Sequence, residues 1–310
     1  MPPFPPRCAG PGGRMSGPGP ESLFAPPFVV DEPERHSLSY VFNTGHSGAV
    51  YPPSFLAASR LDAVSLRRSE DAFVDRLFAP VVALGAPLMR ACFPRAYLDV
   101  NREPYELDPR MFDGRLPPFA NVRSMRVAGG LGTVPRVVAD GQEIYRARLP
   151  VEEATARIET LYKPYHRTLR GLLARTAARF GHVVLIDCHS MPSTSLGREE
   201  GPRVDVVLGD RFGTACAHVL TDCVEAAFRA QGFRVVRNKP YAGGFITEHY
   251  GEPALGRHAL QVEINRALYM DERTLTPRPG FEALVASLAA VFGGVAALPL
   301  DLAPARIAAE

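Results

Sequence analysis

The sequence predicts an α/β fold with a mixed, largely parallel central sheet flanked by helices. Three observations indicate this class. The chain has 310 residues, 46% of them apolar, which is enough to form a sizeable core. Short apolar runs typical of strands alternate with longer amphipathic runs typical of helices. Strands that alternate with helices are the pattern of a sheet whose centre is parallel.

The first 34 residues are predicted to be a disordered tail, and residues 35–310 a single α/β domain. The opening stretch MPPFPPRCAGPGGRMSGPGP is rich in proline and glycine and lacks the apolar core of a signal peptide. No apolar run reaches about 18 residues, so we expect no membrane span. The five cysteines are odd in number and irregularly spaced, which favours reduced thiols in the cytoplasm. A net charge of +2 gives no reason to expect a nucleic-acid partner.

The first half of the domain contains two predicted strands and one predicted helix. A strand over about 38–43 leads into the segment that holds His46. The segment SEDAFVDRLFAPVVALG then forms a helix with Ser69 as its N-cap and Asp71 in its first turn. A short strand over 94–100 follows.

The second half begins with a long helix over 151–180, which Pro164 kinks or breaks because proline cannot continue the backbone hydrogen bonding. The later elements, in order, are a strand over 183–187, a helix over 213–231, a strand over 233–237, a glycine-punctuated loop over 241–251, a strand over 258–270 that passes into a turn, and a helix over 280–293.

Polar side chains follow or end four of the predicted strands: His46, the pair Asn101-Arg102, His189 and Glu263. In open α/β sheets, ligands bind in the crevice beyond the carboxyl ends of the strands. We therefore expect these residues to share one site. Pattern alone leaves other interpretations open, namely an ordinary loop histidine at 46, a strand-capping histidine at 189, and a salt-bridged glutamate at 263.

Two histidines and one carboxylate form a typical ligand set for catalytic zinc, which keeps a fourth position open. The acidic candidates are Glu70, Asp71 and Asp75, with Asp71 ranked first. An acidic residue at a helix N-terminus can instead simply stabilise the helix dipole. The HExxH motif of one class of zinc proteases is absent from the sequence, and so is the GxSxG of serine hydrolases.

The chain resembles the N-formylglutamate amidohydrolase family. The resemblance covers nearly everything from about residue 38 to 275 and rests on segments that follow one another in the family's order. These segments are NTGHSG (43–48), SEDAFVDRLF (69–78), DVNREP (99–104), GLGTVPRV (130–137), YKPYH (162–166), IDCHSMPS (186–193), DVVLGDRFG (205–213), YAGGFITEHYG (241–251) and QVEINRALYMDE (261–272).

The resemblance implies a fold similar to that of the zinc carboxypeptidases, of the phosphorylase/hydrolase-like kind, and a Zn²⁺ cofactor. It implies His46, Asp71 and His189 as metal ligands, with Glu70 or Asp75 as the alternative acid, because His46 is not followed by the HxxE pattern of the zinc carboxypeptidases. It also implies Glu263 as general base. The remaining roles that it implies are a substrate carboxylate clamp of Asn101, Arg102 and Arg136, and supporting positions at His166, Asp187, Tyr241 and His249.

The activity implied is zinc-dependent hydrolysis of N-formyl-L-glutamate to formate and L-glutamate, so the expected partner is a small acidic N-acyl amino acid. One alternative is a zinc deacylase or carboxypeptidase that acts on another N-acyl amino acid or small peptide, because a fold does not fix the substrate. The second alternative is a non-catalytic carboxylate-binding protein.

Overall fold

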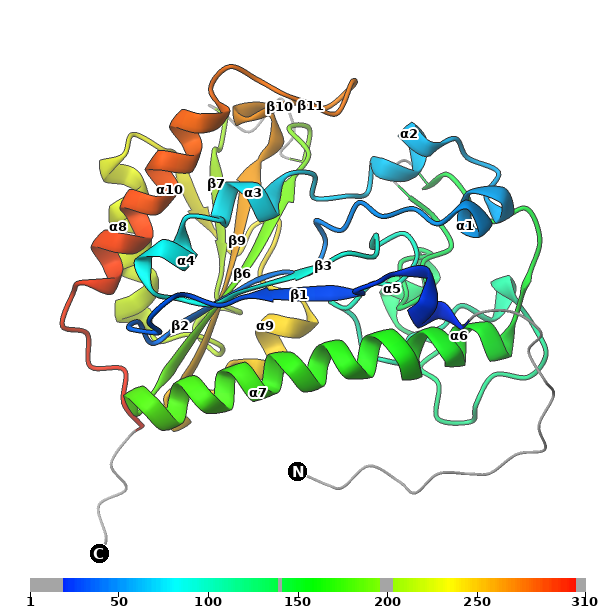
Figure 1. Ribbon diagram of the computed structural model, residues 1–310, viewed down its shortest axis with the longest axis horizontal. Helices are drawn as coiled ribbons and strands as arrows, with labels where there is room; N and C mark the ends of the chain where they lie inside the picture. Colours follow the sequence, from blue (N-terminus) through cyan, green and yellow to red (C-terminus); the bar gives the residue numbers. More distant parts are fainter. Residues whose placement is uncertain (1–18, 139–140, 196–202, 305–310) are drawn as a thin grey trace, which may run out of the picture.

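A seven-stranded sheet forms the centre of the computed structural model, which describes residues 19–138, 141–195 and 203–304 (Figure 1). Its strand order is β1-β3-β2-β6-β9-β7-β8. Neighbours run parallel except at β1–β3 and β9–β7, which confirms the mixed, largely parallel sheet. The strands are β1 (Phe28–Asp31), β2 (Tyr40–Thr44), β3 (Leu88–Ala91), β6 (Val183–Met191), β7 (Val206–Gly209), β8 (Val235–Arg237) and β9 (Arg257–Asn265).

Helices cover both faces of this sheet (Figure 1). One face carries α7 (Lys163–Phe180) and α9 (Phe245–Tyr250), and the other carries α3 (Val74–Phe78), α4 (Val81–Leu84), α8 (His218–Ala230) and α10 (Phe281–Ala296). The shorter elements are α1 (Pro53–Ala58), α2 (Ala63–Arg67), α5 (Met125–Ala128), α6 (Val151–Arg157) and the strand pairs β4 (Phe112–Asp113) with β5 (Leu149–Pro150) and β10 (Met270–Asp271) with β11 (Thr276–Pro277). Across the described ranges, every helix is too short or too polar to cross a membrane.

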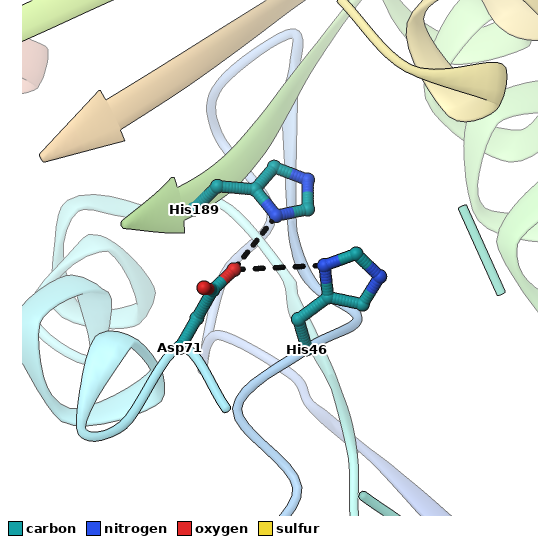
Figure 2. Close-up of side chains that lie close together, drawn as sticks. All are labelled: His46, Asp71 and His189. Carbon is teal, nitrogen blue, oxygen red and sulfur yellow. Dashed lines mark hydrogen bonds and ion pairs between the residues drawn. The ribbon is translucent and has the colours of Figure 1, made fainter. Parts of the chain in front are cut away.

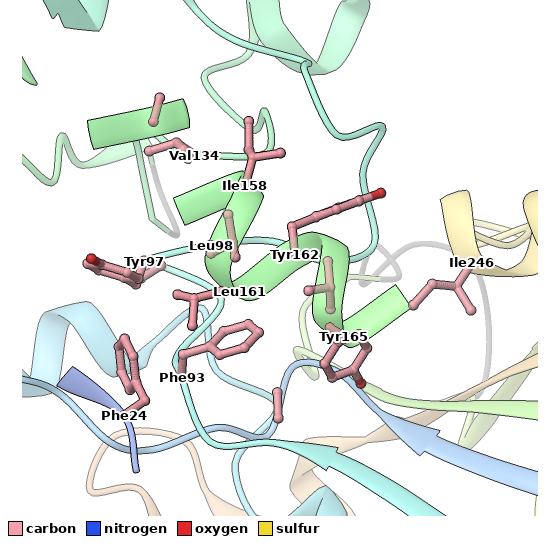
Figure 3. Close-up of a cluster of buried hydrophobic side chains, with 14 of the residues drawn as sticks. Phe24, Phe93, Tyr97, Leu98, Val134, Ile158, Leu161, Tyr162, Tyr165 and Ile246 are labelled. Atoms are coloured by element: carbon pink, nitrogen blue, oxygen red, sulfur yellow. The ribbon is translucent and has the colours of Figure 1, made fainter. Parts of the chain in front are cut away.

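The central strands divide their side chains between two apolar cores, because successive side chains of a strand point to opposite faces. Val41 and Leu185 enter the core beneath α7, part of which Figure 3 shows around Tyr165. Phe42 and Ile186, one position further on, enter the core beneath α10. Each such buried side chain stabilises the fold by about 1.5–3 kcal/mol relative to an exposed one. The sheet is therefore a rigid support that is buried on both faces.

The tail predicted over residues 1–34 extends too far. Phe24 is buried in the core beneath α7, and β1 pairs antiparallel with β3 at the edge of the sheet. An edge strand tolerates the prolines around it, because half of its backbone groups need no partner strand. The disorder expected for the first part of the tail falls on residues 1–18, outside the described residues. That residues 35–310 form one domain stays a prediction.

The helix predicted from Ser69 begins five residues later, at Val74, and is divided into α3 and α4. The Ser69 hydroxyl donates to the carbonyl oxygen of Leu66 and does not cap a helix. Phe73 has a left-handed backbone (φ 66°), which starts α3, and Pro80 separates the two short helices. Asp71 therefore lies in a turn and does not share a helix face with Asp75.

Three other boundaries differ from the predictions. Residues 94–100 form turns and no strand, and their apolar pattern reflects burial of Tyr97 and Leu98 in the core. The loop predicted over 241–251 contains α9. The predicted kink or break does not fall at Pro164 itself, which lies in the first turn of α7; the helical run is interrupted just before it, by a π-helical turn (Ile158–Tyr162) between α6 and α7.

Candidate active site

His189 stands near the carboxyl end of β6 because the two faces of that strand differ. Val183 and Leu185 enter the core beneath α7, and Asp187 and His189 continue the same face in steps of two. The opposite face stays apolar as far as Cys188, which lies in the other core. Asp187 and His189 therefore replace apolar residues on one face of β6 only, near the carboxyl end of the strand.

Glu263 lies beside His189 because β6 and β9 pair in parallel, with His189 opposite Glu263 and Asp187 opposite Gln261. Residues in register on neighbouring strands project to the same face. The amide of Gln261 donates a hydrogen bond of 2.8 Å to Glu263 Oε1. A buried carboxylate is thereby fixed next to the histidine.

His46 comes from the turn that follows β2, and this turn is packed closely. A Cβ atom at Gly48 would lie 2.1 Å from the carbonyl oxygen of Phe93, so no larger residue fits there. The backbone N–H of Asp71 donates to the carbonyl oxygen of His46 at 3.0 Å. This bond joins the two loops that carry the histidine and the aspartate.

The side chains of His46, Asp71 and His189 converge on one point, and all three are buried (Figure 2). Asp71 Oδ2 lies 2.9 Å from Nδ1 of His189 and 3.6 Å from Nδ1 of His46. Nδ1 of His46 has no hydrogen-bond partner among the described residues. A buried polar atom without a partner is costly, and two imidazoles facing one carboxylate are the donor set of a divalent metal site. The three residues therefore fit a metal ion.

The other nitrogen of each histidine is bound to a second carboxylate. Nε2 of His46 lies 2.7 Å from Asp99 Oδ1, and Nε2 of His189 lies 2.9 Å from Asp187 Oδ2. A histidine that donates its outer N–H to a carboxylate is fixed in orientation and becomes a stronger metal ligand. The supporting position expected at Asp187 agrees with this geometry, whereas Asp99 was not singled out from the sequence.

Two carboxylates of the site, those of Asp71 and Asp99, stay ionised. Burial alone would raise the pKa of Asp71, but the hydrogen bond with His189 and the closeness of His46 hold it well below its usual range. The pKa of Asp99 is likewise held well below its usual range, because Arg102, His46 and Arg95 outweigh its burial. Glu263 differs, since burial raises its pKa to about 7. The site thus combines permanent anions with one carboxyl group that can exchange a proton near neutral pH.

The two alternative acidic ligands lie elsewhere. Glu70 accepts hydrogen bonds from Arg67 and from the Tyr51 hydroxyl. Neither Glu70 nor Asp75 joins the cluster of possible metal ligands found among the described residues. The backbone turn explains the choice, because it directs Asp71 alone toward the histidines.

A cavity of about 580 Å³ opens in front of these side chains. Asn101, Arg102 and Tyr241 line it together with Glu263 and the three candidate ligands. Four arginines that sequence reasoning missed also line it: Arg68, Arg95, Arg126 and Arg266. With Arg102 they make the cavity strongly cationic, which suits an anionic molecule.

Arg136, expected in the carboxylate clamp, does not line this cavity. Its guanidinium binds Asp108 at 2.8 Å and Glu143 at 3.0 Å, beside a separate surface cavity. Asn101 does line the main cavity, but its side-chain oxygen accepts a hydrogen bond from the backbone N–H of Ile246. Arg102 is thus the clamp candidate whose guanidinium lies in the cavity.

His166 and His249, expected as supporting residues, do not reach the candidate metal ligands. His166 is buried between the Tyr250 hydroxyl and the carbonyl oxygen of Val100, and His249 is exposed and stacks on Phe245. The Tyr241 hydroxyl is hydrogen-bonded to Ser195 at the edge of the cavity. Arg266 supports the site directly, since it donates to Asp71 at 2.9 Å and to Ser190 at 3.1 Å.

For two of the residues that were missed, Asp99 and Arg266, the sequence does contain a signal. Asp99 stands first in the segment DVNREP, and Arg266 follows directly on β9. Arg95 lies in a turn and Arg126 in the four-residue helix α5, and neither element is long enough for a periodicity to show which way a side chain points.

Comparison with known proteins gives a consistent result. Residues 38–270 match the family model described as N-formylglutamate amidohydrolase. An N-formylglutamate deformylase of Pseudomonas aeruginosa is 29% identical over 77% of this chain and 85% of its own length. One of Pseudomonas putida is 31% identical over 65% of this chain and 71% of its own length.

Two solved structures resemble the fold. The crystal structure of an N-formylglutamate amidohydrolase from Ralstonia eutropha matches with a TM-score of 0.82 and 36% identity, over 87% of this chain and 97% of that chain. A gene product of Agrobacterium tumefaciens matches with a TM-score of 0.60 at 19% identity, over 86% and 94% of the two chains, which is a likeness of fold alone. The likeness to zinc carboxypeptidases stays a prediction.

Proposed function

Because the chain belongs to the N-formylglutamate amidohydrolase family, we propose that it hydrolyses N-formyl-L-glutamate to formate and L-glutamate with the aid of Zn²⁺. The observation that carries the proposal is the convergence of His46, Asp71 and His189 beside Glu263 in a cationic cavity. Membership of the family supports the type of reaction. The candidate metal ligands, a general base and cationic side chains in the cavity are the groups that such a reaction needs.

His46, Asp71 and His189 would hold the zinc ion, with Asp99 and Asp187 fixing the histidines. A bound zinc ion supplies Lewis acidity to the formyl carbonyl group and lowers the pKa of water. The orphaned Nδ1 of His46 supports this role, because a cation satisfies it where no described protein group does.

Glu263 would act as the general base. It takes a proton from the attacking water and delivers that proton to the amide nitrogen as the carbon–nitrogen bond breaks. One water is consumed, and formate and the free amino group of glutamate are the products. A carboxyl group whose pKa lies at about 7 suits both steps near neutral pH.

Arg102 would bind a substrate carboxylate. Its side chain is 12% exposed and lies in the cavity next to Asp99. A guanidinium presents two parallel N–H groups to a carboxylate, a geometry that lysine does not offer. A formylated acidic amino acid is a dianion at neutral pH, and the cationic lining favours it over a neutral analogue.

A cytoplasmic location is part of the same proposal. The four described cysteines, Cys92, Cys188, Cys216 and Cys223, are free, as is usual in a reducing compartment.

The test is a paired measurement on the purified full chain. We expect about one zinc ion per chain, and formate release from N-formyl-L-glutamate that stops after chelation and returns with added zinc. Zinc binding with release of a different acid from another N-acyl amino acid would favour a deacylase of other specificity. Neither zinc nor formate release after zinc is restored would contradict the proposal and favour a non-catalytic carboxylate-binding protein.

A further inference from the structure

The arginines that line the cavity differ in what already occupies their guanidinium groups. Arg95 donates to Asp99 at 2.9 Å, and Arg266 donates to Asp71 at 2.9 Å. Both are therefore engaged with carboxylates that build the candidate metal centre. Arg102 donates to the carbonyl oxygens of Asn101 and Leu131 and lies 3.6 Å from Asp99.

Arg126 is held much more loosely. It lies in α5 and its nearest carboxylate oxygen among the described residues is that of Glu106, at 4.0 Å. Its side chain is 36% exposed, against 12% for Arg102. Burial, together with the charges of Arg95 and Arg126, lowers the pKa of Arg102, so these cations lie close enough to repel one another. A carboxylate bound beside Arg102 and Arg126 would relieve this repulsion.

The depth of the two arginines matches the two carboxylates of the substrate. Arg102 lies next to Asp99, which binds His46, so it is near the point where the amide bond is cleaved. In N-formylglutamate the side-chain carboxylate is two carbon atoms farther from the amide nitrogen than the α-carboxylate is. The more exposed Arg126 is therefore the partner for the more distant carboxylate.

We propose that Arg126 binds the side-chain carboxylate of the substrate and so sets the preference for acidic N-formyl amino acids; this inference rests on the proposed function. Arg126 is a specificity-determining residue in this assignment, and it takes no part in the proton transfers. The substrate class that follows is N-formyl amino acids with a carboxylate at the end of a short side chain.

The test compares N-formyl-L-glutamate with N-formyl-L-glutamine, an analogue of equal size whose side chain is uncharged. The measured quantity is the ratio of the two kcat/KM values. In Arg126→Met we expect kcat/KM for the glutamate substrate to fall about 10- to 100-fold, which corresponds to one lost charge-assisted contact, and that for the glutamine analogue to change little. Arg126→Lys keeps the charge and should retain an intermediate ratio.

Arg123→Met is the matched control, because Arg123 lies three residues before Arg126, is exposed and does not line the cavity. We expect it to change the ratio by less than about threefold, through screened charge alone. An equal loss for both substrates in Arg126→Met, or an equal fall of the ratio in Arg123→Met, would overturn the inference. Binding of the product L-glutamate by calorimetry should weaken in Arg126→Met to the same extent as kcat/KM. Wild-type protein inactive on both compounds would instead contradict the proposed function, and the inference with it.

Discussion

The candidate active site has two halves that are built in different ways. Asp187, His189 and Glu263 stand on β6 and β9, where strand register places each side chain. His46, Asp71 and Asp99 stand on turns, and they are positioned by hydrogen bonds to one another and to arginines. The strand half is fixed by the backbone, whereas the loop half is fixed by charge.

This difference has a physical consequence. The backbone of a central strand cannot move without breaking ladder hydrogen bonds on both sides, so the direction in which each of its side chains leaves the strand is fixed. The loop half depends on the balance between the carboxylates and the guanidiniums around it. A substitution that removes a charge should therefore disturb the loop half more than the strand half.

Glu263→Gln should have the largest effect on the reaction, because glutamine has nearly the same shape but cannot accept a proton. We expect kcat for formate release to fall about 10²- to 10⁴-fold with zinc content unchanged. The measurement is single-turnover formate release alongside metal analysis. The matched control is Glu70→Gln, which removes a buried carboxylate that binds Arg67 and Tyr51 outside the cluster.

The control should retain zinc and formate release to within a few fold, since its carboxylate faces away from the histidines. Loss of zinc in Glu70→Gln would show that the loop half uses a different acidic ligand. Full activity in Glu263→Gln would show that Glu263, on the strand half of the site, is not the general base.

A second pair of variants compares the two halves directly. Asp187→Asn and Asp99→Asn each remove the carboxylate that binds Nε2 of a candidate ligand. We expect zinc affinity to fall about 10- to 100-fold in each, measured by competition with a chromogenic chelator. The loss of zinc affinity should be larger in Asp99→Asn than in Asp187→Asn, because Arg95 then loses its carboxylate partner as well. The reverse order would contradict the division into a charge-held half and a backbone-held half.

The same division explains how much could be predicted from the sequence. His189 and Glu263 were identifiable because the apolar runs VVLI and LQVEI indicate strands that carry or deliver them, and the family resemblance added Asp187. The central sheet was identifiable for the same reason. The position of a strand and the alternation of its side chains are local properties, which contacts with distant segments leave unchanged.

The loop half required information that the chain order does not contain. Pattern alone left Glu70, Asp71 and Asp75 open, and the family resemblance placed Arg136 in the clamp. The left-handed turn at Phe73 directs Asp71 inward, and Asp108 and Glu143 hold Arg136 elsewhere. Both outcomes depend on contacts between segments far apart in the chain. Arg126 was missed because its helix, α5, has four residues and is too short to show a period.

His166 should link the loop half to pH-dependent stability. Its Nε2 donates to the carbonyl oxygen of Val100, between Asp99 and Asn101, and burial lowers its pKa to about 3. Below about pH 6.5 the unfolded chain takes up a proton here that the folded chain does not. The free energy of unfolding therefore falls with decreasing pH, by up to about 1.4 kcal/mol per pH unit from this group alone.

The variant His166→Gln keeps a donor near that position and removes the titration. Between pH 7.5 and 5.0, wild-type protein should lose about 2 kcal/mol more stability than the variant, measured by urea unfolding. Other titrating groups cancel in this difference. Equal losses in both proteins would contradict this and show that the pKa of His166 is the same in the folded and unfolded chains.

Arg136→Ala should have the smallest effect on the reaction, and it separates family resemblance from geometry most sharply. Arg136 binds Asp108 and Glu143 beside a different cavity, so its loss removes no group that faces the candidate metal centre. We expect kcat/KM for N-formyl-L-glutamate to stay within about twofold, and stability to fall by about 1 kcal/mol because these ion pairs are partly exposed. Arg102→Ala is the contrasting variant, with a loss of about 10- to 100-fold if its guanidinium binds a substrate carboxylate. A larger loss of kcat/KM in Arg136→Ala than in Arg102→Ala would show that Arg136, as the sequence resemblance implied, binds the substrate carboxylate. It would contradict the assignment of that role to Arg102.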